Sequence, residues 1–199
     1  MVSIEPKVRL NIIIDTAWEI LFQRIAYKRF KVNKESSLQL HLSKIIHDLG
    51  DVFCILPDER FDIELETAYN NKNIDIICSL GDVQAAIELK CFKKSSNRAR
   101  DIDLYDVLND IQRLDNFDGF AIKKFICLAD SSYYSSTEPK GMANSVKITE
   151  GTHYKSNIEI IPGWVGKWKI KRDEPIILKN DLICKWVNQD DWYYLKVDR

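Results

Sequence analysis

Three charged residues, Asp75, Glu88 and Lys90, interrupt two apolar runs in the middle of the chain. The runs, residues 73–80 and 83–92, are typical of two strands joined by a tight turn at Gly81-Asp82. An unpaired charge in a protein core costs several kcal/mol. Three charges at one place therefore point to chemistry.

The alternation of side chains along a strand places Glu88 and Lys90 on one face, and the hairpin brings Asp75 alongside on the neighbouring strand. Mg²⁺ prefers oxygen ligands, commonly one or two carboxylates together with water and substrate phosphate. A nearby lysine can stabilise charge that grows on a phosphorus centre, or help to orient and deprotonate water. The pattern predicts a metal-assisted phosphoryl site.

The surrounding sequence predicts the elements that would position these residues. Asp15 is a candidate cap for the first helix, and Gly50 is a candidate stop for the second. The first strand alternates, so Glu64 and Glu66 are expected to face outward as solvated edge charges, although one of them could reach the site. In chain order we expect helices at 15–30 and 35–49, strands at 61–68, 73–80 and 83–92, a helix at 101–118 and a strand at 124–130.

The chain changes character after residue 130. Residues 131–145 are polar, contain Pro and Gly, and are expected to form a loop. Short strand-like runs follow at 158–161, 164–170, 176–178, 182–187 and 192–197. Antiparallel strands followed by a helical crossover to another strand predict a mixed α/β sheet.

Asp75, a spacer of twelve residues and then Glu88-Leu89-Lys90 resemble the PD-(D/E)xK signature of restriction-endonuclease-like nucleases. Glu-x-Lys occurs three times in the chain, but only this copy lies in an apolar strand, and the usual Pro is replaced by Asn73-Ile74. The order of elements from 35 to 130 is also similar to the core of that family. The resemblance implies a restriction-endonuclease-like mixed β-sheet core flanked by helices at 35–130, after an N-terminal helical extension at 1–34 and before a β-rich C-terminal extension at 131–199.

The resemblance also implies roles for individual residues. Asp75 and Glu88 would bind Mg²⁺ (or Mn²⁺ as a substitute) with the backbone carbonyl of Leu89, and Lys90 would assist the attacking water. Glu35, on the apolar stripe of the second expected helix, matches an acidic residue that many members carry there. Secondary candidates are Gln39, one turn further on, and Gln112 on the helix after the motif, for which a solvated position is the alternative.

Basic residues gather in three stretches, 28–34, 93–100 and the KWKIKR segment at 167–172. The middle stretch leaves the motif strand directly, and its Lys93, Lys94, Arg98 and Arg100 are candidates for binding nucleic-acid phosphates. A solvated surface is the alternative for each stretch. The four Trp residues after position 160 could stack on bases, but packing of a small β subdomain explains them as well.

Bulk properties narrow the class of protein. The net charge is −1, which gives no global attraction to nucleic acid or acidic lipid. No apolar run approaches the ~20 residues that span a bilayer, and no signal peptide is evident, so we expect no membrane association. The five Cys residues form no CxxC pair, which favours reduced thiols and a cytoplasmic location.

The sequence therefore predicts an Mg²⁺-dependent endonuclease that hydrolyses phosphodiester bonds in DNA, with RNA left open as a substrate. A role in restriction or defence is compatible with it, and cutting both strands of a duplex favours a homodimer. The alternatives are a catalytically inactive nuclease fold that acts as a nucleic-acid-binding or protein-interaction module, and an assembly protein whose aromatic tail packs on a partner.

Overall fold

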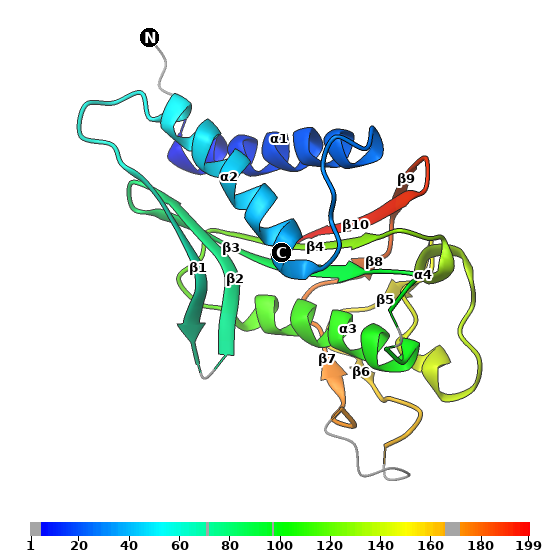
Figure 1. Cartoon of the computed structure of the whole chain (residues 1–199). Helices are drawn as coiled ribbons and strands as arrows, with labels where there is room; N and C mark the ends of the chain where they lie inside the picture. The colour runs from blue at the N-terminus through cyan, green and yellow to red at the C-terminus, as the bar shows by residue number, and fades with distance from the viewer. Residues whose placement is uncertain (1–4, 71, 97, 166–171) are drawn as a thin grey trace. The chain divides into compact units, whose positions relative to one another are not determined.

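A computed structural model describes residues 5–70, 72–96, 98–165 and 172–199 (Figure 1). Most of the expected run at 164–170 and most of the basic KWKIKR segment fall on residues 166–171, outside the described residues. The elements are α1 Pro6–Ala26, α2 Glu35–Phe53, β1 Phe61–Tyr69, β2 Lys72–Leu80, β3 Val83–Phe92, α3 Arg100–Asn116, β4 Ile122–Ala129, α4 Tyr133–Ser136, the 3₁₀ helix η1 Gly141–Val146, β5 His153–Tyr154, β6 Glu159–Ile160, β7 Ile176–Ile177, β8 Leu182–Ile183, β9 Trp186–Gln189 and β10 Trp192–Asp198.

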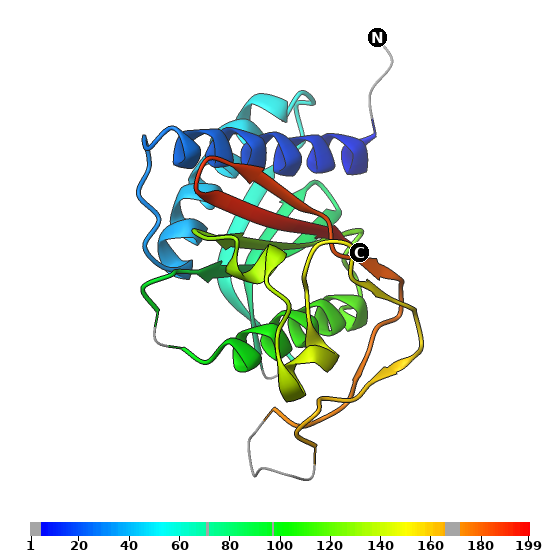
Figure 2. The same cartoon turned by 90° about the vertical axis from the view of Figure 1, so that its right-hand side faces the viewer.

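The fold is mixed α/β, as expected. One six-stranded mixed sheet has the order β1-β2-β3-β4-β10-β9, and two further sheets pair β5 with β8 and β6 with β7. β10 and β9 form an antiparallel hairpin, drawn in red in Figure 2. The chain divides into two compact units. The first contains the residues up to Cys91 together with Asp118–Lys124 and Asp198, and the second contains Phe92–Phe117, Phe125–Val197 and Arg199.

The core of the first unit is formed by helices α1 and α2, which pack on each other, and by strand β2, which both helices contact. The apolar stripe of α1 is fully buried, and so are the apolar residues of α2 that face it. Within the unit the buried side chains include Leu10, Ile13, Ile14, Ala17, Trp18, Leu21, Leu38, Leu42, Ile46, Ile74, Ile76, Cys78, Ala85, Ile87 and Leu89.

Helix α1 begins nine residues earlier than expected, because Pro6 occupies its first turn and Leu10 and Ile13 extend the buried stripe. Asp15 therefore lies inside the helix rather than at its cap. Its carboxylate pairs at 2.8 Å with the ammonium of Lys124, which is 1% exposed and also pairs with Asp198 at 2.6 Å.

The predicted helix stop at Gly50 is wrong, because α2 continues to Phe53. The glycine is needed for packing instead. A methyl group added at Gly50 would overlap the aromatic ring of Phe61 on β1, so only glycine allows strand and helix to approach this closely. β1 also departs from strict alternation, since Leu65 is 44% exposed.

A buried ion pair anchors the segment between α2 and β1. The guanidinium of Arg9 on α1 donates to both carboxylate oxygens of Glu59 and to the carbonyl of Phe53. These hydrogen bonds lower the pKa of Glu59 from its usual value, and the burial of the carboxylate opposes that change. The pair thus holds the segment that leads from α2 into β1 against helix α1.

In the second unit, α3 contacts η1 and β7. The expected loop at 131–145 contains the short α4 and most of η1, and the two-residue β5 was not expected. Trp164 is 1% exposed and its indole N–H donates to the carbonyl of Arg172, so this Trp packs inside the unit. No helix in the described residues has the length and apolar character needed to cross a membrane.

Candidate functional site

Asp75 and Glu88 lie side by side on the antiparallel strands β2 and β3. Ile76 on β2 is paired with Ile87 on β3, so Asp75 and Glu88 are the next residues along the two strands and share the opposite face. The carboxylate of Asp75 reaches across to β3, where its Oδ2 accepts a hydrogen bond of 2.6 Å from the backbone N–H of Leu89. The two carboxylates are therefore neighbours on one face of the β2–β3 pair in the first unit.

Glu88 is only 1% exposed. A carboxylate removed from water this completely is costly to stability, and such positions are concentrated at functional sites. Its neighbours along β3, Ile87 and Leu89, are fully buried on the other face of the sheet. The strand thus places Glu88 beside Asp75.

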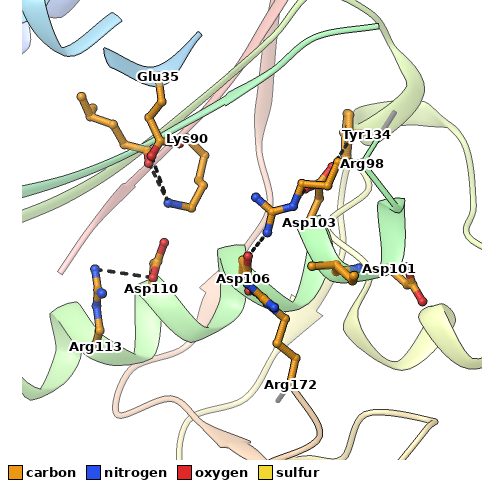
Figure 3. Close-up of polar contacts among 12 residues, drawn as sticks. Glu35, Lys90, Arg98, Asp101, Asp103, Asp106, Asp110, Arg113, Tyr134 and Arg172 are labelled. Atoms are coloured by element: carbon orange, nitrogen blue, oxygen red, sulfur yellow. Dashed lines mark hydrogen bonds and ion pairs between the residues drawn. The ribbon is translucent and has the colours of Figure 1, made fainter. Parts of the chain in front are cut away.

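Lys90 completes the motif on the same face of β3 as Glu88. Its Nζ donates to the carbonyl of Leu89 at 3.0 Å and lies 3.6 Å from Oε1 of Glu35 (Figure 3). The Lys90 side chain is 14% exposed and that of Glu35 is 42% exposed, so the pair stands at the edge of the site, with the carboxylate toward solvent. Lys90 therefore links the motif strand to α2.

The start of α2 positions Glu35. The hydroxyl of Ser37 accepts hydrogen bonds from the backbone N–H groups of Asn33 and Lys34, which satisfies donors at the beginning of the helix. Glu35 is the first residue of the helix, where a negative side chain interacts favourably with the helix dipole. The local sequence thus fixes the helix end that carries the site's third carboxylate.

Gln39, one turn further along α2, connects three elements. Its side-chain Nε2 donates to the backbone carbonyl of Asp75 at 2.8 Å and to Oε1 of Glu66 on β1 at 2.9 Å. Gln39 is 8% exposed, so both hydrogen bonds form away from bulk water. This side chain fixes the backbone from which the Asp75 carboxylate projects.

Glu66 is one of the two edge carboxylates that the sequence left open as able to reach the site. In the register of β1 and β2 it stands opposite Asp75, between the pairs Leu65–Ile76 and Thr67–Ile74. Its backbone has a φ of +52°, a left-handed conformation that is costly for a residue other than glycine. Glu66 is exposed, as expected, but its carboxylate is held by Gln39. The alternating pattern of β1 contains no signal for this distortion.

The donor set of the site fits a hard divalent cation by its chemistry. Asp75 and Glu88 supply carboxylates, the carbonyl of Leu89 supplies a backbone oxygen, and Glu35 adds a further carboxylate at the rim. The ammonium of Lys90 contacts both the Leu89 carbonyl and Glu35, so a metal ion at that carbonyl would compete with it. No cluster of three or more His, Cys, Asp or Glu side chains suited to a metal ion occurs among the described residues, so the fit depends on two carboxylates with the carbonyl, water and substrate.

Comparisons with known proteins give no match. No family model, no curated protein and no solved structure matches this chain.

The expected phosphate-binding residues lie in the second unit and differ in their contacts. Lys93 pairs with Asp130 at 2.8 Å and its ammonium lies 4.3 Å from the ring centre of Trp192. The Lys94 side chain is exposed. Arg98 pairs with Asp103 and Asp106, while Arg100 donates to the backbone carbonyls of Tyr133 and Thr137. The two arginines thus have intrachain structural contacts.

Gln112 also makes structural contacts in the second unit. Its side-chain oxygen accepts a hydrogen bond of 2.5 Å from the backbone N–H of Ile177 on β7. Its backbone carbonyl accepts one from the side chain of Asn116. These contacts tie α3 to β7, and a role for Gln112 at the metal site stays a prediction.

Proposed function

We propose that this chain is a metal-dependent nuclease with a restriction-endonuclease-like core, which hydrolyses phosphodiester bonds in DNA. The observation that carries the proposal is the contact between the carboxylate of Asp75 and the backbone of Leu89. It brings the isolated aspartate against the Glu88-Leu89-Lys90 strand, as the chemistry of the sequence motif requires. The element order α2, β1, β2, β3, α3, β4 supports it, being similar to that of the family core.

The proposed site would hold its cation with Asp75, Glu88 and the Leu89 carbonyl. When bound, Mg²⁺ or Mn²⁺ would supply Lewis-acid stabilisation of the phosphate and lower the pKa of a bound water. Gln39 and Glu66 keep the Asp75 backbone in place, so that its carboxylate need not reorganise during the reaction.

In the proposed reaction Lys90 acts on the attacking water and on the charge that develops at phosphorus. A water oxygen forms a bond to phosphorus while the bond from phosphorus to the leaving oxygen breaks; the attacking water loses a proton to solvent, and the leaving oxygen takes one up from solvent. The ammonium of Lys90 orients the water and stabilises the added negative charge. Glu35 holds that ammonium at the rim, 3.6 Å away.

The direct test is a cleavage assay. Supercoiled plasmid, linear duplex and single-stranded DNA are incubated with the protein in Mg²⁺, in Mn²⁺ and in chelator. We expect metal-dependent loss of substrate with the wild-type chain and none with Asp75→Asn prepared in parallel, a control that excludes a contaminating nuclease. Cleavage that persists in the Asp75→Asn preparation, or none with any substrate, would count against the proposal. A homodimer, which double-strand cutting favours, is tested by light scattering on the same preparation.

One observation favours a second function, a nuclease fold that binds nucleic acid or a protein partner without cutting. The Leu89 carbonyl, an expected metal ligand, accepts a hydrogen bond from Lys90, so a metal ion there would have to displace the ammonium. Metal binding separates the two functions. Mn²⁺ should raise the melting temperature of the wild-type chain but not that of Asp75→Asn if the site binds metal.

A further inference from the structure

The second unit contains a cavity of about 420 Å³ with an unusual lining. Nine described residues line it, and they come from two segments, 93–98 (of which residue 97 lies outside the described residues) and 131–137. Three are basic, Lys93, Lys94 and Arg98, and the other six are serine, threonine or tyrosine. Among the described residues the lining includes no carboxylate and no aliphatic side chain. This composition suits a ligand that is anionic and rich in hydrogen-bond acceptors.

A polar network around the buried Asp103 holds the two segments together. Asp103 on α3, which is 2% exposed, accepts a hydrogen bond of 2.6 Å from the hydroxyl of Tyr134 and pairs with Arg98 at 2.8 Å (Figure 3). Arg98 also pairs with Asp106. The Tyr134 ring stacks on Phe92 with ring centres 4.3 Å apart. Arg98 and Tyr134 therefore build the wall, and the Arg98 charge is balanced within the chain.

Further contacts hold the backbones of the two segments that line the cavity. The N–H of Asp130 donates to the carbonyl of Phe92, and the Asp130 carboxylate accepts from the N–H of Lys94 and pairs with Lys93. Arg100 donates to the carbonyls of Tyr133 and Thr137. Both lining segments are thus anchored by their backbones, which reduces the entropy lost when a ligand binds.

The ammonium of Lys94 is the cation best placed to meet a ligand. The residue is exposed, and within the described part of the chain its side chain takes part in no ion pair. The ring of Tyr133, 48% exposed, lines the same cavity, and the guanidinium of Arg100 lies 4.1 Å from the centre of that ring. An anion-binding group and an exposed aromatic surface are the two contacts that a nucleotide uses.

We propose that this cavity binds one nucleotide of a single strand, with its phosphoryl group on Lys94 and the hydroxyls of Ser96, Ser131 and Ser132, and its base on the ring of Tyr133. The volume is in the range of small-ligand sites and is far too small for a duplex. The inference depends on the cavity alone and holds whether or not the chain cleaves DNA.

The test uses the full chain in chelator, so that no metal-dependent reaction takes part. Inorganic phosphate, the dinucleotide pTpT with a 5′-phosphate, and TpT without it are titrated by calorimetry and by amide-shift mapping. We expect pTpT to bind more tightly than TpT, with the largest shifts at 93–98 and 131–137. Lys94→Gln should weaken pTpT and phosphate about tenfold, the value of one charge-assisted hydrogen bond. Lys185→Gln, an exposed lysine of the same unit outside the lining, is the control and should change neither.

The Tyr133 variants separate the base contact from the phosphate contact. Tyr133→Leu should weaken pTpT roughly tenfold, because stacking on an aromatic ring contributes that much per base, and leave inorganic phosphate binding unchanged. Tyr133→Phe keeps the ring and should bind pTpT like the wild-type chain. Equal affinity for pTpT and TpT, equal behaviour of Lys94→Gln and Lys185→Gln, or shifts centred outside the two segments would overturn the inference. None of these outcomes bears on the cleavage assay.

Discussion

The carboxylate of Asp75 is hydrogen-bonded at 2.6 Å to the backbone N–H of Leu89, so a side chain of β2 closes onto the main chain of β3. The last backbone pair before this point is Ile76 with Ile87. Asp75 thus connects β2 to the Glu88-Leu89-Lys90 motif on β3. Substitutions at Asp75 can separate the effect of this hydrogen bond on stability from the effect of the negative charge on activity.

Asp75→Asn keeps an oxygen that can accept from Leu89, whereas Asp75→Ala removes it. We expect Asp75→Asn to unfold in urea at nearly the wild-type midpoint, and Asp75→Ala to lose roughly 1–3 kcal/mol of unfolding free energy, because the buried N–H loses its partner. Both should lack cleavage and Mn²⁺ stabilisation. An Asp75→Asn protein that cuts DNA at the wild-type rate would remove this carboxylate from the mechanism.

Lys90→Ala tests the ammonium. The carboxylates remain, so Mn²⁺ should still raise the melting temperature, but cleavage should fall by about 10²–10³, the usual loss for one charge-stabilising group. The matched control is Lys44→Ala, an exposed lysine on α2 whose partner among the described residues is the exposed Asp48. Rates are measured at saturating metal. Unchanged cleavage by Lys90→Ala would show that another group acts on the water.

Gly50→Ala tests the packing of α2 on β1, because we expect this substitution to lower stability where it would usually raise it. In an ordinary helix interior, glycine to alanine stabilises by about 1 kcal/mol. Here the added methyl group would overlap the Phe61 ring, and overpacking of this kind typically costs ~1–3 kcal/mol. We therefore expect Gly50→Ala to lower the urea midpoint of the wild-type chain. In a chain that already carries Phe61→Leu, which removes the ring, adding Gly50→Ala should not lower the midpoint further. A more stable Gly50→Ala protein would contradict the close approach.

Glu59 sets an acid dependence of stability. Its hydrogen bonds from Arg9 hold its pKa in the folded chain below the ordinary value of 4.5. Because the folded pKa is the lower one, this contribution is complete above the unfolded pKa and is lost as the pH falls through the folded pKa. Glu59→Gln should therefore be less stable than the wild-type chain at pH 7 and approach it in strong acid. Urea unfolding across this pH range measures it, with Asp58→Asn, an exposed neighbour, expected to follow the wild-type curve.

The sequence predicted the placement of the motif because strand signals are local. Alternation and the Gly81-Asp82 turn are enough to bring Asp75 beside Glu88, and the strands form close to the expected bounds. Helix ends were harder to predict. Pro6 is a helix-start signal that lies well before Asp15. Glycine often ends a helix, but Gly50 lies inside α2, where it makes room for the ring of Phe61, eleven residues further along.

Features that depend on distant partners were not readable from local patterns. Gln39 reaches residues 27 and 36 positions further along, and Arg100 reaches carbonyls 33 and 37 positions away. The basic stretch at 93–100 looks uniform in sequence. In the structure Lys93, Arg98 and Arg100 contact other groups of the chain, whereas the Lys94 side chain is exposed. The left-handed backbone of Glu66 also could not be predicted from the sequence, because glutamate has no preference for that conformation.

That backbone has a consequence for how the chain can change over generations. Glycine at position 66 would relieve a penalty of about 1–3 kcal/mol, so selection for stability alone favours replacing the glutamate. Selection that maintains the Gln39 contact opposes the replacement. A randomised library at this position, sorted for thermal resistance in one arm and for metal-dependent activity in the other, should thus diverge toward glycine in the first arm and stay with glutamate in the second. The amino acid found at 66 in naturally diverged copies would then report whether each copy still uses its site.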